Sequence, residues 1–291
     1  MPERGLSLVG FVNDASQAIR HLQQDCVPVP GRDSEAALMQ EWQDARAKLG
    51  ARFPHAGLTD PQPIPDAFQP YLDTLQQQPW MATCLHELED ASFRVVEIDP
   101  LICHQITIAT PRVEEVCATL HRPSFADLLE LCLPIKHPVV EYEASPVELH
   151  SSSVILKSRR GDLHIGRFGV FDGRSEVLLL GARLRWAMPF VQVARVDGRY
   201  HLVNGYHRLL GARMAGATHV PCVFRDALNY EAASITFDSQ YGRIGFPVSL
   251  LTSDNPPTFG HFTQGRAHEV ALRARSRIVH VSWHEYTIDD E

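Results

Sequence analysis

The sequence predicts a mixed α/β (α+β) protein, and three features of residues 190–226 carry that prediction. Apolar residues alternate with polar or small ones from Val191 onward, which is the period of a half-buried strand. Asp197-Gly198 is a strong two-residue hairpin signal, and Tyr200–Val203 follows it as the returning strand. Asn204-Gly205 then ends this strand, and the apolar residues after it take a helical spacing. A hairpin that leads through a sharp turn into a helix combines strand and helix within one short segment.

Length and composition indicate a globular chain. At 291 residues and 32.6 kDa it can bury the core of one elaborated domain or of two. Hydrophobic residues make up 44% and charged residues 21%, as in folded rather than disordered proteins. The formal net charge of −8 argues against general nucleic-acid binding, because proteins that bind polyanions usually carry a cationic excess.

The sequence also predicts where the protein works. No run of about 20 apolar residues is present, so we expect no membrane span. The apolar run near the N-terminus is too short for a secretory signal. The six cysteines are scattered without a C-x-x-C pair, which is typical of reduced thiols. We therefore expect a cytoplasmic protein.

Residues 1–92 are expected to form a helical N-terminal region that lies against the core or at a subunit contact. Ser34 is a plausible helix cap, and Gly50 would end the same helix. Prolines between Pro54 and Pro70 force an extended connection. The expected helices are Asp14–Gln24, Ser34–Leu49, Asp66–Gln77 and Trp80–Asp90.

The predicted core begins with a strand at Arg94–Asp99. Polar residues follow it, at a place where ligand groups often lie in open α/β sheets. Glu97 could bind a divalent cation or act as a general base, whereas Asp99 is better explained by a turn at Asp99-Pro100. Cys103-His104 is a weak candidate for a cysteine nucleophile. Two helices should follow, at Val113–Leu120 and Ser124–Cys132.

Residues 137–188 predict an inserted β-ribbon, and residues 227–291 a C-terminal extension packed on the core. The ribbon is locally basic, which indicates a solvated sheet edge or, alternatively, a surface that faces phosphate or a partner. Its expected strands are Val147–Lys157, Leu163–Phe171 and Glu176–Leu180, joined by hairpin turns at Arg159–Asp162 and Phe171–Arg174. In the extension, proline and glycine breaks precede one strand at Ile278–Trp283.

The chemistry is expected at the Gly205 turn. A strand that enters a helix through glycine leaves the first helical N–H groups aimed outward, and with the helix dipole they form an anion site. His207 and Arg208, in the first turn of the predicted helix, would add side-chain donors. The alternative is that Gly205 only makes the turn, while His207 and Arg208 are solvated or pair with nearby acids.

Residues 196–226, VDGRYHLVNGYHRLLGARMAGATHVPCVFRD, resemble the nucleotide-binding core of the ParB/sulfiredoxin superfamily. In that family a strand ends in a glycine turn that opens a helix, followed by an A-x-x-x-G exit and a V-P strand. The matching residues here are Gly205–Arg208, Ala212–Gly216 and Val220-Pro221. The resemblance implies a ParB/sulfiredoxin-like core over residues 93–226, interrupted by the insertion at about 137–188.

A weaker match lies upstream, and the departures from the family are specific. Arg94–Leu101 resembles the family's opening strand, and Gln105 the glutamine of its first box, although the arginine of that box is missing. Tyr206 stands where sulfiredoxin-like members carry a catalytic cysteine and CTP-hydrolysing ParB proteins a metal-holding glutamate. Repair of sulfinic acids by a thiol at this position is therefore excluded. Some members phosphorylate free serine with a histidine- and arginine-bearing turn, with which this sequence is compatible.

We therefore expect the chain to bind a nucleotide or another phosphorylated small ligand, with phosphoryl transfer to a small molecule as an extension. The phosphate-binding residues would be Asn204, Gly205, Tyr206, His207 and Arg208, with His207, Arg208 and Glu97 as catalytic candidates and Gln105 as a further ligand-binding residue. The cofactor would be ATP or another nucleotide with Mg²⁺, and no zinc ligand set is present. The alternative is a catalytically silent ParB-like module that binds a protein partner or another copy of itself.

Overall fold

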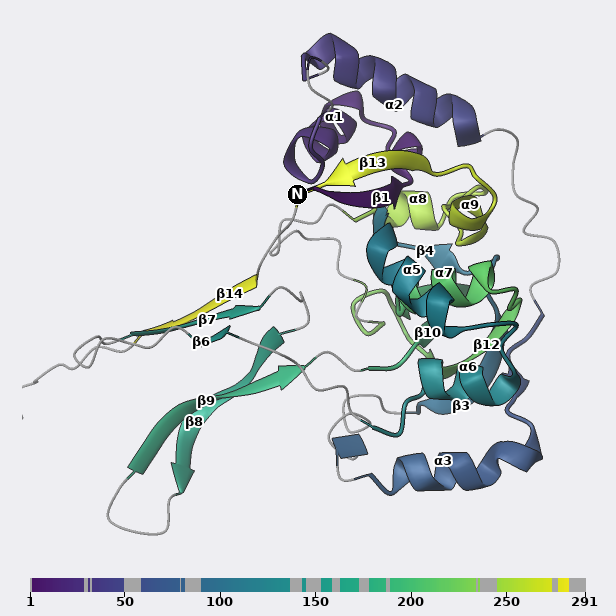
Figure 1. The fold of residues 1–291 in the computed structure, drawn as a ribbon, viewed down its shortest axis with the longest axis vertical. Helices are drawn as coiled ribbons and strands as arrows, with labels where there is room; N and C mark the ends of the chain where they lie inside the picture. The colour runs from purple at the N-terminus through teal and green to yellow at the C-terminus, as the bar shows by residue number, and fades with distance from the viewer. Residues whose placement is uncertain are drawn as a thin grey trace, which may run out of the picture. The chain divides into compact units, whose positions relative to one another are not determined.

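A computed structural model defines the fold, and it divides the chain into two compact units (Figure 1). The first unit comprises Met1–His137 and Phe190–Ala274, and the second comprises Pro138–Pro189 and Arg275–Glu291. The structure describes residues 2–28, 31, 33–49, 59–78, 80–81, 90–136, 143–144, 153–158, 163–172, 178–186, 189–233, 235, 245–273 and 277–282.

A six-stranded mixed sheet organises the first unit. Its strands, in spatial order, are β2 (Gln62–Pro63), β3 (Ser92–Glu97), β12 (His219–Asp226), β10 (Gln192–Val196), β11 (Arg199–Asn204) and β4 (Ile102–Cys103). The pairs β10–β12 and β11–β4 are parallel, while the other neighbours are antiparallel. The combination of such a sheet with helices confirms the mixed α/β class predicted from the sequence.

The hairpin and the helix after it form as predicted. Asp197 and Gly198 have φ angles of 49° and 74°, the left-handed conformations that a tight turn between β10 and β11 requires. Helix α7 (Tyr206–Met214) follows β11, and the chain returns through β12. Gly211 in α7 lies close to Val116, because an added Cβ would come 2.5 Å from its Cγ1. The two helices α5 (Thr110–Thr119) and α7 therefore pack backbone to side chain.

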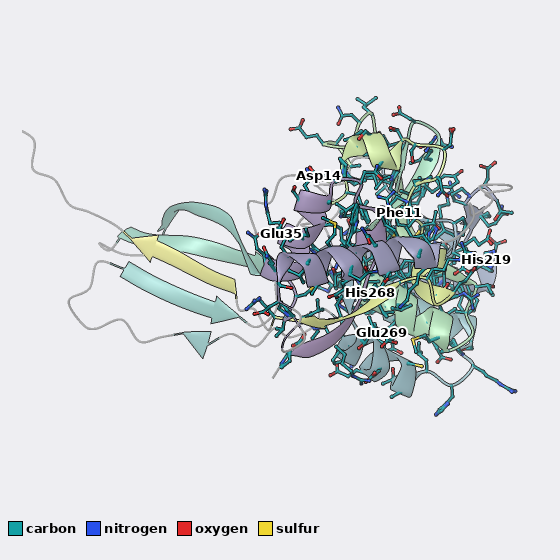
Figure 2. All side chains as sticks on the ribbon, turned by 90° about the horizontal axis from the view of Figure 1, so that it is seen from above. Phe11, Asp14, Glu35, His219, His268 and Glu269 are labelled. Carbon is teal, nitrogen blue, oxygen red and sulfur yellow. The ribbon has the colours of Figure 1, made fainter. Side chains whose placement is uncertain are left out.

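The predicted N-terminal helices are present where the structure describes them. Asp14 caps α1 (Ala15–Gln24) by accepting from the amides of Ser16 and Gln17, and Ser34 accepts from the amide of Ala37 at the start of the next helix. Figure 2 labels Asp14 and Glu35, which lie at the starts of these two helices. The remaining helices are α2 (Glu35–Leu49), η2 (Asp66–Phe68), α3 (Gln69–Gln76), α5 (Thr110–Thr119), α6 (Phe125–Cys132), α8 (Val248–Leu251) and α9 (Gly260–Thr263). Most of the helix expected at Trp80–Asp90 lies outside the described residues.

The N-terminal region also contains a strand that the sequence did not predict. Strand β1 (Glu3–Ser7) is the centre of a three-stranded antiparallel sheet, between β13 (His268–Leu272) and β5 (Thr107–Ala109). The 3₁₀ turn η1 (Val9–Phe11) follows it. A five-residue strand carries too few alternations to be recognised by periodicity, and its partners lie about 100 and 265 residues away in sequence.

The second unit contains two small sheets. One has the order β14 (Arg277–Ser282), β7 (Ser153–Ser158) and β6 (Glu143–Ala144), and the other pairs β8 (Leu163–Asp172) with β9 (Leu178–Trp186). Strands β8 and β9 pair antiparallel, as expected for two strands joined by the turn predicted at Phe171–Arg174. The turn expected at Arg159–Asp162 lies outside the described residues, and the described partners of β7 are β14 and β6. Among the described residues, no helix has the length and apolarity needed to cross a membrane.

Candidate functional site

The predicted anion-binding turn lies at the N-terminus of α7. Gly205 precedes the helix with φ 105° and ψ 16°, and as a glycine it supplies no side-chain cap to α7. A Cβ at Gly205 would come within 2.8 Å of Cγ2 of Val191. Glycine is thus required here both by the left-handed backbone and by Val191, which packs directly on the turn.

Two polar side chains of the turn reach the same backbone oxygen. Asn204 Nδ2 and Arg208 Nη2 each donate to the carbonyl of Phe190 at 3.0 Å. The chain at Phe190-Val191 is held in turn by α6, since the Val191 amide donates to the carbonyl of Cys132. These bonds fix the guanidinium of Arg208 beside the first turn of α7. Burial lowers its pKa, yet a guanidinium stays charged at neutral pH.

Tyr206, the first residue of α7, is built into the fold. Its ring is buried, and its hydroxyl accepts from the amides of His104 (3.0 Å) and Gln105 (3.4 Å) while it donates to the carbonyl of Leu202 (2.9 Å). Burial raises the pKa of Tyr206 well above its ordinary value. The hydroxyl therefore connects three chain segments and is not available as a nucleophile or a base.

The sequence-predicted glutamine comes to the same place, although its side chain is already engaged. The parallel pairing of β4 with β11 carries His104 and Gln105 towards the Gly205 turn. Gln105 Nε2 donates to the carbonyl of Thr107 at 2.5 Å, and its amide donates to Tyr206. Gln105 thus supports the turn through its backbone and stabilises its own loop through its side chain.

The histidine beside the turn is neutral at physiological pH. Nδ1 of His104 lies 3.1 Å from the hydroxyl of Tyr206, and burial lowers the pKa of His104 to about 4. Its neighbour Cys103 is fully buried, which raises the pKa of the thiol well above its ordinary value. A thiol kept protonated by burial is unreactive, so Cys103 and His104 do not form a nucleophile pair.

Glu97, predicted as a catalytic residue or metal ligand, does not join the turn. It ends β3 opposite His219, the first residue of β12, and its carboxylate accepts from Thr59 Oγ1 at 3.4 Å. The adjacent Asp99 forms an ion pair with Arg213, in the last turn of α7. Glu97 therefore lies near the C-terminal end of this nine-residue helix, about 13 Å of helix away from Gly205.

The donor set does not indicate a metal centre. Within the described part of the chain, no group of three or more His, Cys, Asp or Glu side chains could hold a metal ion. Mg²⁺ bound through the phosphates of a nucleotide would need few protein ligands, and Glu97 is not placed to be one of them.

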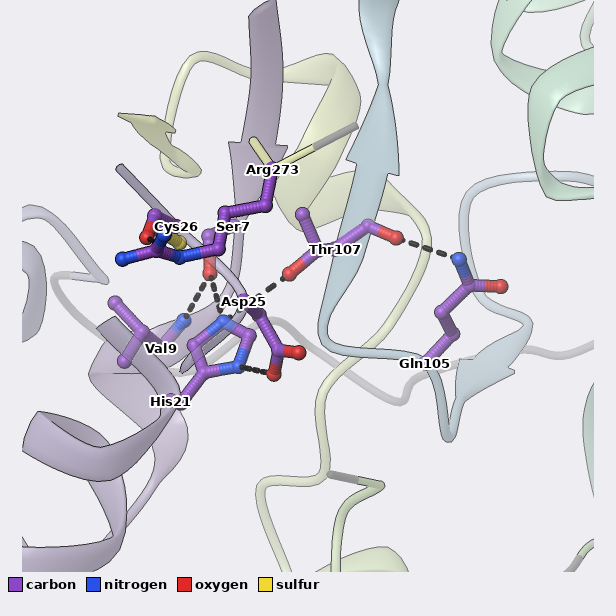
Figure 3. A network of polar contacts seen from close by, with 8 residues as sticks. All are labelled: Ser7, Val9, His21, Asp25, Cys26, Gln105, Thr107 and Arg273. Atoms are coloured by element: carbon purple, nitrogen blue, oxygen red, sulfur yellow. Dashed lines mark hydrogen bonds and ion pairs between the residues drawn. The ribbon is translucent and has the colours of Figure 1, made fainter. Parts of the chain in front are cut away.

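A buried Ser–His–Asp arrangement lies elsewhere in this unit and was not predicted from the sequence (Figure 3). His21 Nδ1 lies 2.7 Å from Asp25 Oδ2, and its Nε2 lies 3.4 Å from Ser7 Oγ and 3.2 Å from Thr107 Oγ1. Ser7 is only 1% exposed, and its Oγ accepts from the amide of Val9. This geometry joins β1, α1 and β5, and it gives a substrate no access to Ser7, so we assign it a structural role.

A second buried histidine was also missed. His201 on β11 is 1% exposed, and neither of its ring nitrogens has a hydrogen-bond partner in the described residues. Its ring packs edge-on against Tyr230 at 5.2 Å. Burial lowers the pKa of His201 to about 4, and the positive charge of Arg199 acts in the same direction. The only sequence signal was its place between the apolar positions of a strand.

A cavity in the first unit lies away from the Gly205 turn. Its volume is about 450 Å³, and it is lined by residues of β2, η2, α3 and β3 together with Val223 of β12.

Comparison of the chain with models of known protein families, with curated proteins and with solved structures gave no match.

Proposed function

We propose that the chain binds a nucleotide or another phosphorylated small ligand at the N-terminus of α7. The observation that carries the proposal is the start of this helix: Gly205 supplies no side-chain cap, and Arg208 is fixed in the first turn. Backbone amides of Tyr206, His207 and Arg208 would donate to phosphate oxygens, and the helix dipole favours a negative charge there. The resemblance to the ParB/sulfiredoxin superfamily supports the same residues.

The proposed activity is binding, and phosphoryl transfer would depend on His207. Tyr206 contributes only its backbone, because its hydroxyl is held by His104, Gln105 and Leu202. The half-buried His207 is the remaining side chain of the turn that could move a proton. ATP or another nucleotide, with Mg²⁺ carried on its phosphates, is the proposed cofactor.

The binding is tested by titration of ¹⁵N-labelled protein with inorganic phosphate, ATP, ADP, CTP and GTP, each with and without Mg²⁺. We expect the largest amide shifts at Tyr206, His207 and Arg208, and a rise in melting temperature with the tightest ligand. The variant Arg208→Gln should weaken binding about tenfold or more, since hydrogen bonds to charged groups contribute about 1.5–3 kcal/mol.

Arg195→Gln is the matched control for that variant. Arg195 pairs with Asp226 on the exposed side of β10 and β12, so its loss should leave ligand binding unchanged. Unchanged amide positions at 206–208 with every ligand at millimolar concentration would refute the binding proposal. If the unaltered protein releases ADP from ATP and His207→Ala does not, the proposal extends from binding to phosphoryl transfer.

One observation favours the alternative of a catalytically silent ParB-like interaction module. The residue at the family's catalytic position, Tyr206, serves here to connect β4 and β11 to α7. A module of this kind would bind a protein partner or a second copy of the chain, and it would bind no nucleotide. Concentration-dependent mass by light scattering, together with a flat nucleotide titration, would support it.

A further inference from the structure

The cavity of about 450 Å³ lies between α3 and the outer part of the six-stranded sheet. Its volume is within the range of small-molecule sites, which run from about 300 to 1,000 Å³. Buried apolar side chains form part of its wall, namely Ile64, Leu72 and Val223. No residue of the Gly205 turn contributes to it, so it is a separate feature of the unit.

Two residues of opposite charge, Arg94 and Asp66, line this cavity and do not form an ion pair with each other. Arg94, on β3, is half-buried, and its side chain makes no hydrogen bond or ion pair with another described residue. Asp66, in η2, is exposed at the same cavity, and its carboxylate likewise has no partner among the described residues. The guanidinium nitrogens of Arg94 lie more than 4.0 Å from the carboxylate oxygens of Asp66, since the two residues do not form an ion pair.

The rest of the lining adds hydrogen-bonding groups and apolar surface. Ser92, Gln69 and Gln76 supply a hydroxyl and two amides, of which Gln69 already donates to Asp73. A guanidinium with five donors suits a planar carboxylate, and a carboxylate on the facing element suits an ammonium group. A phosphate dianion fits less well, because Asp66 would repel it.

We propose that this cavity binds a small zwitterion, with the ligand's carboxylate on Arg94 and its ammonium group on Asp66. The apolar part of the ligand lies against Ile64, Leu72 and Val223. The chemical class is that of free amino acids and other small amino-carboxylates, which match a cavity whose two charges sum to zero. This site is independent of the phosphate site proposed at α7.

The experiment uses the full-length protein and calorimetric titration with free amino acids, β-alanine and 4-aminobutyrate. For an aromatic probe, phenylalanine is compared with N-acetylphenylalanine, which lacks the ammonium charge, and phenylalaninamide, which lacks the carboxylate. We expect at least one zwitterion to bind, and both of its singly charged derivatives to bind about tenfold more weakly or worse.

Two variants assign the charges. Arg94→Gln and Asp66→Asn should each weaken binding of the zwitterion about tenfold. The Arg94→Gln variant should also bind phenylalanine and phenylalaninamide with equal affinity. Asp66 is exposed, so Asp66→Asn keeps the test valid if Arg94→Gln reduces folding. The matched controls are Arg4→Gln and Glu114→Gln, which remove a solvated ion pair outside the cavity and should change nothing.

The variants test the zwitterion site separately from the phosphate site proposed at α7. Arg94→Gln should leave nucleotide binding unchanged, and Arg208→Gln should leave zwitterion binding unchanged. The proposal is overturned if no zwitterion binds at about 10 mM, which corresponds to a very weak affinity. It is also overturned if Arg94→Gln and Asp66→Asn bind the zwitterion as the unaltered protein does.

Discussion

At the scale of single residues, the polar side chains around the Gly205 turn stabilise the fold through hydrogen bonds to the backbone. Tyr206 brings the backbone of His104 and Gln105 to α7 through one hydroxyl. Arg208 and Asn204 hold the carbonyl of Phe190. An anion at the turn would thus meet a rigid set of donors, whose positions are fixed by bonds inside the protein.

Tyr206→Phe should lower the free energy of unfolding by about 1–3 kcal/mol, because it leaves buried backbone groups without a partner. Urea denaturation measures the change. Tyr71→Phe is the matched control: the Tyr71 hydroxyl donates to a single carbonyl, that of Leu133, from a half-buried site. Its loss should cost less, and an equal cost for both variants would contradict the role assigned to Tyr206.

The two neutral histidines predict how stability depends on pH. Burial lowers the pKa of both His104 and His201 to about 4, whereas an unfolded histidine titrates near 6.5. Between these values the unfolded chain binds more protons than the native protein, so stability falls as the pH drops from about 6.5 towards 4. Each histidine contributes a slope of up to about 1.4 kcal/mol per pH unit.

His201→Leu tests this slope at one position. Neither ring nitrogen of His201 has a described hydrogen-bond partner, so an apolar side chain of similar volume should be tolerated at pH 7. The unfolding free energy between pH 6.5 and 4 should then depend less steeply on pH than in the unaltered protein. The same slope with and without His201 would show that its ring is already protonated, or is solvated, in the native state.

At the scale of elements, the junction between β11 and α7 is set by one glycine. Gly205 combines φ 105° with direct packing against Val191. Val191 in turn accepts from the amide of Val223, so the turn, β10 and β12 form one packed unit. The position of the first amides of α7 therefore follows from the packing of the sheet.

Gly205→Ala should destabilise the protein by about 2–4 kcal/mol, as the sum of backbone strain and a clash with Val191. Gly216→Ala is the control, because Gly216 has φ 102° with no atom within 4 Å of an added Cβ. Thermal unfolding should show a larger loss at Gly205 than at Gly216. In the background of Val191→Ala the additional loss should shrink, and equal losses at the two glycines would rule out the packing contribution.

At the scale of the whole molecule, the chain leaves the first unit at His137 and returns to it at Phe190. Within the first unit, the Val191 amide donates to the carbonyl of Cys132 at 2.9 Å, so the start of the returning chain is bonded to the end of α6. The last part of the chain, from Arg275, belongs to the second unit and pairs β14 with β7. The first unit thus contains the six-stranded sheet, the Gly205 turn and the cavity.

A variant that replaces residues 138–188 by a short Gly/Ser linker and ends at Ala274 should fold cooperatively. We expect its melting temperature to stay within a few degrees of the same transition in the full chain, since a short loop costs little closure entropy. Calorimetry and the ¹⁵N spectrum of residues 190–226 measure this. Loss of the cooperative transition would show that the second unit is needed to fold the first.

Local sequence signals predicted much of the fold. Asp197-Gly198 fixed the hairpin because its turn requires positive φ angles, and Asp14 and Ser34 marked helix starts because their side chains accept from free amides. Gly205 marked the start of α7 for the same local reason. Strand β1 escaped prediction, since it is short and its hydrogen-bond partners are distant in sequence.

By itself, the sequence determined the α/β class and the order of hairpin, glycine turn and helix, because periodicity, turn residues and caps act within a few neighbouring residues. Only the tertiary structure decided which polar groups meet. It brought Gln105 to the turn and kept Glu97 at the other end of α7, and it committed the Tyr206 hydroxyl to the backbone. The physical reason is that strand pairing sets these distances, and pairing joins segments about 100 residues apart that no local pattern connects.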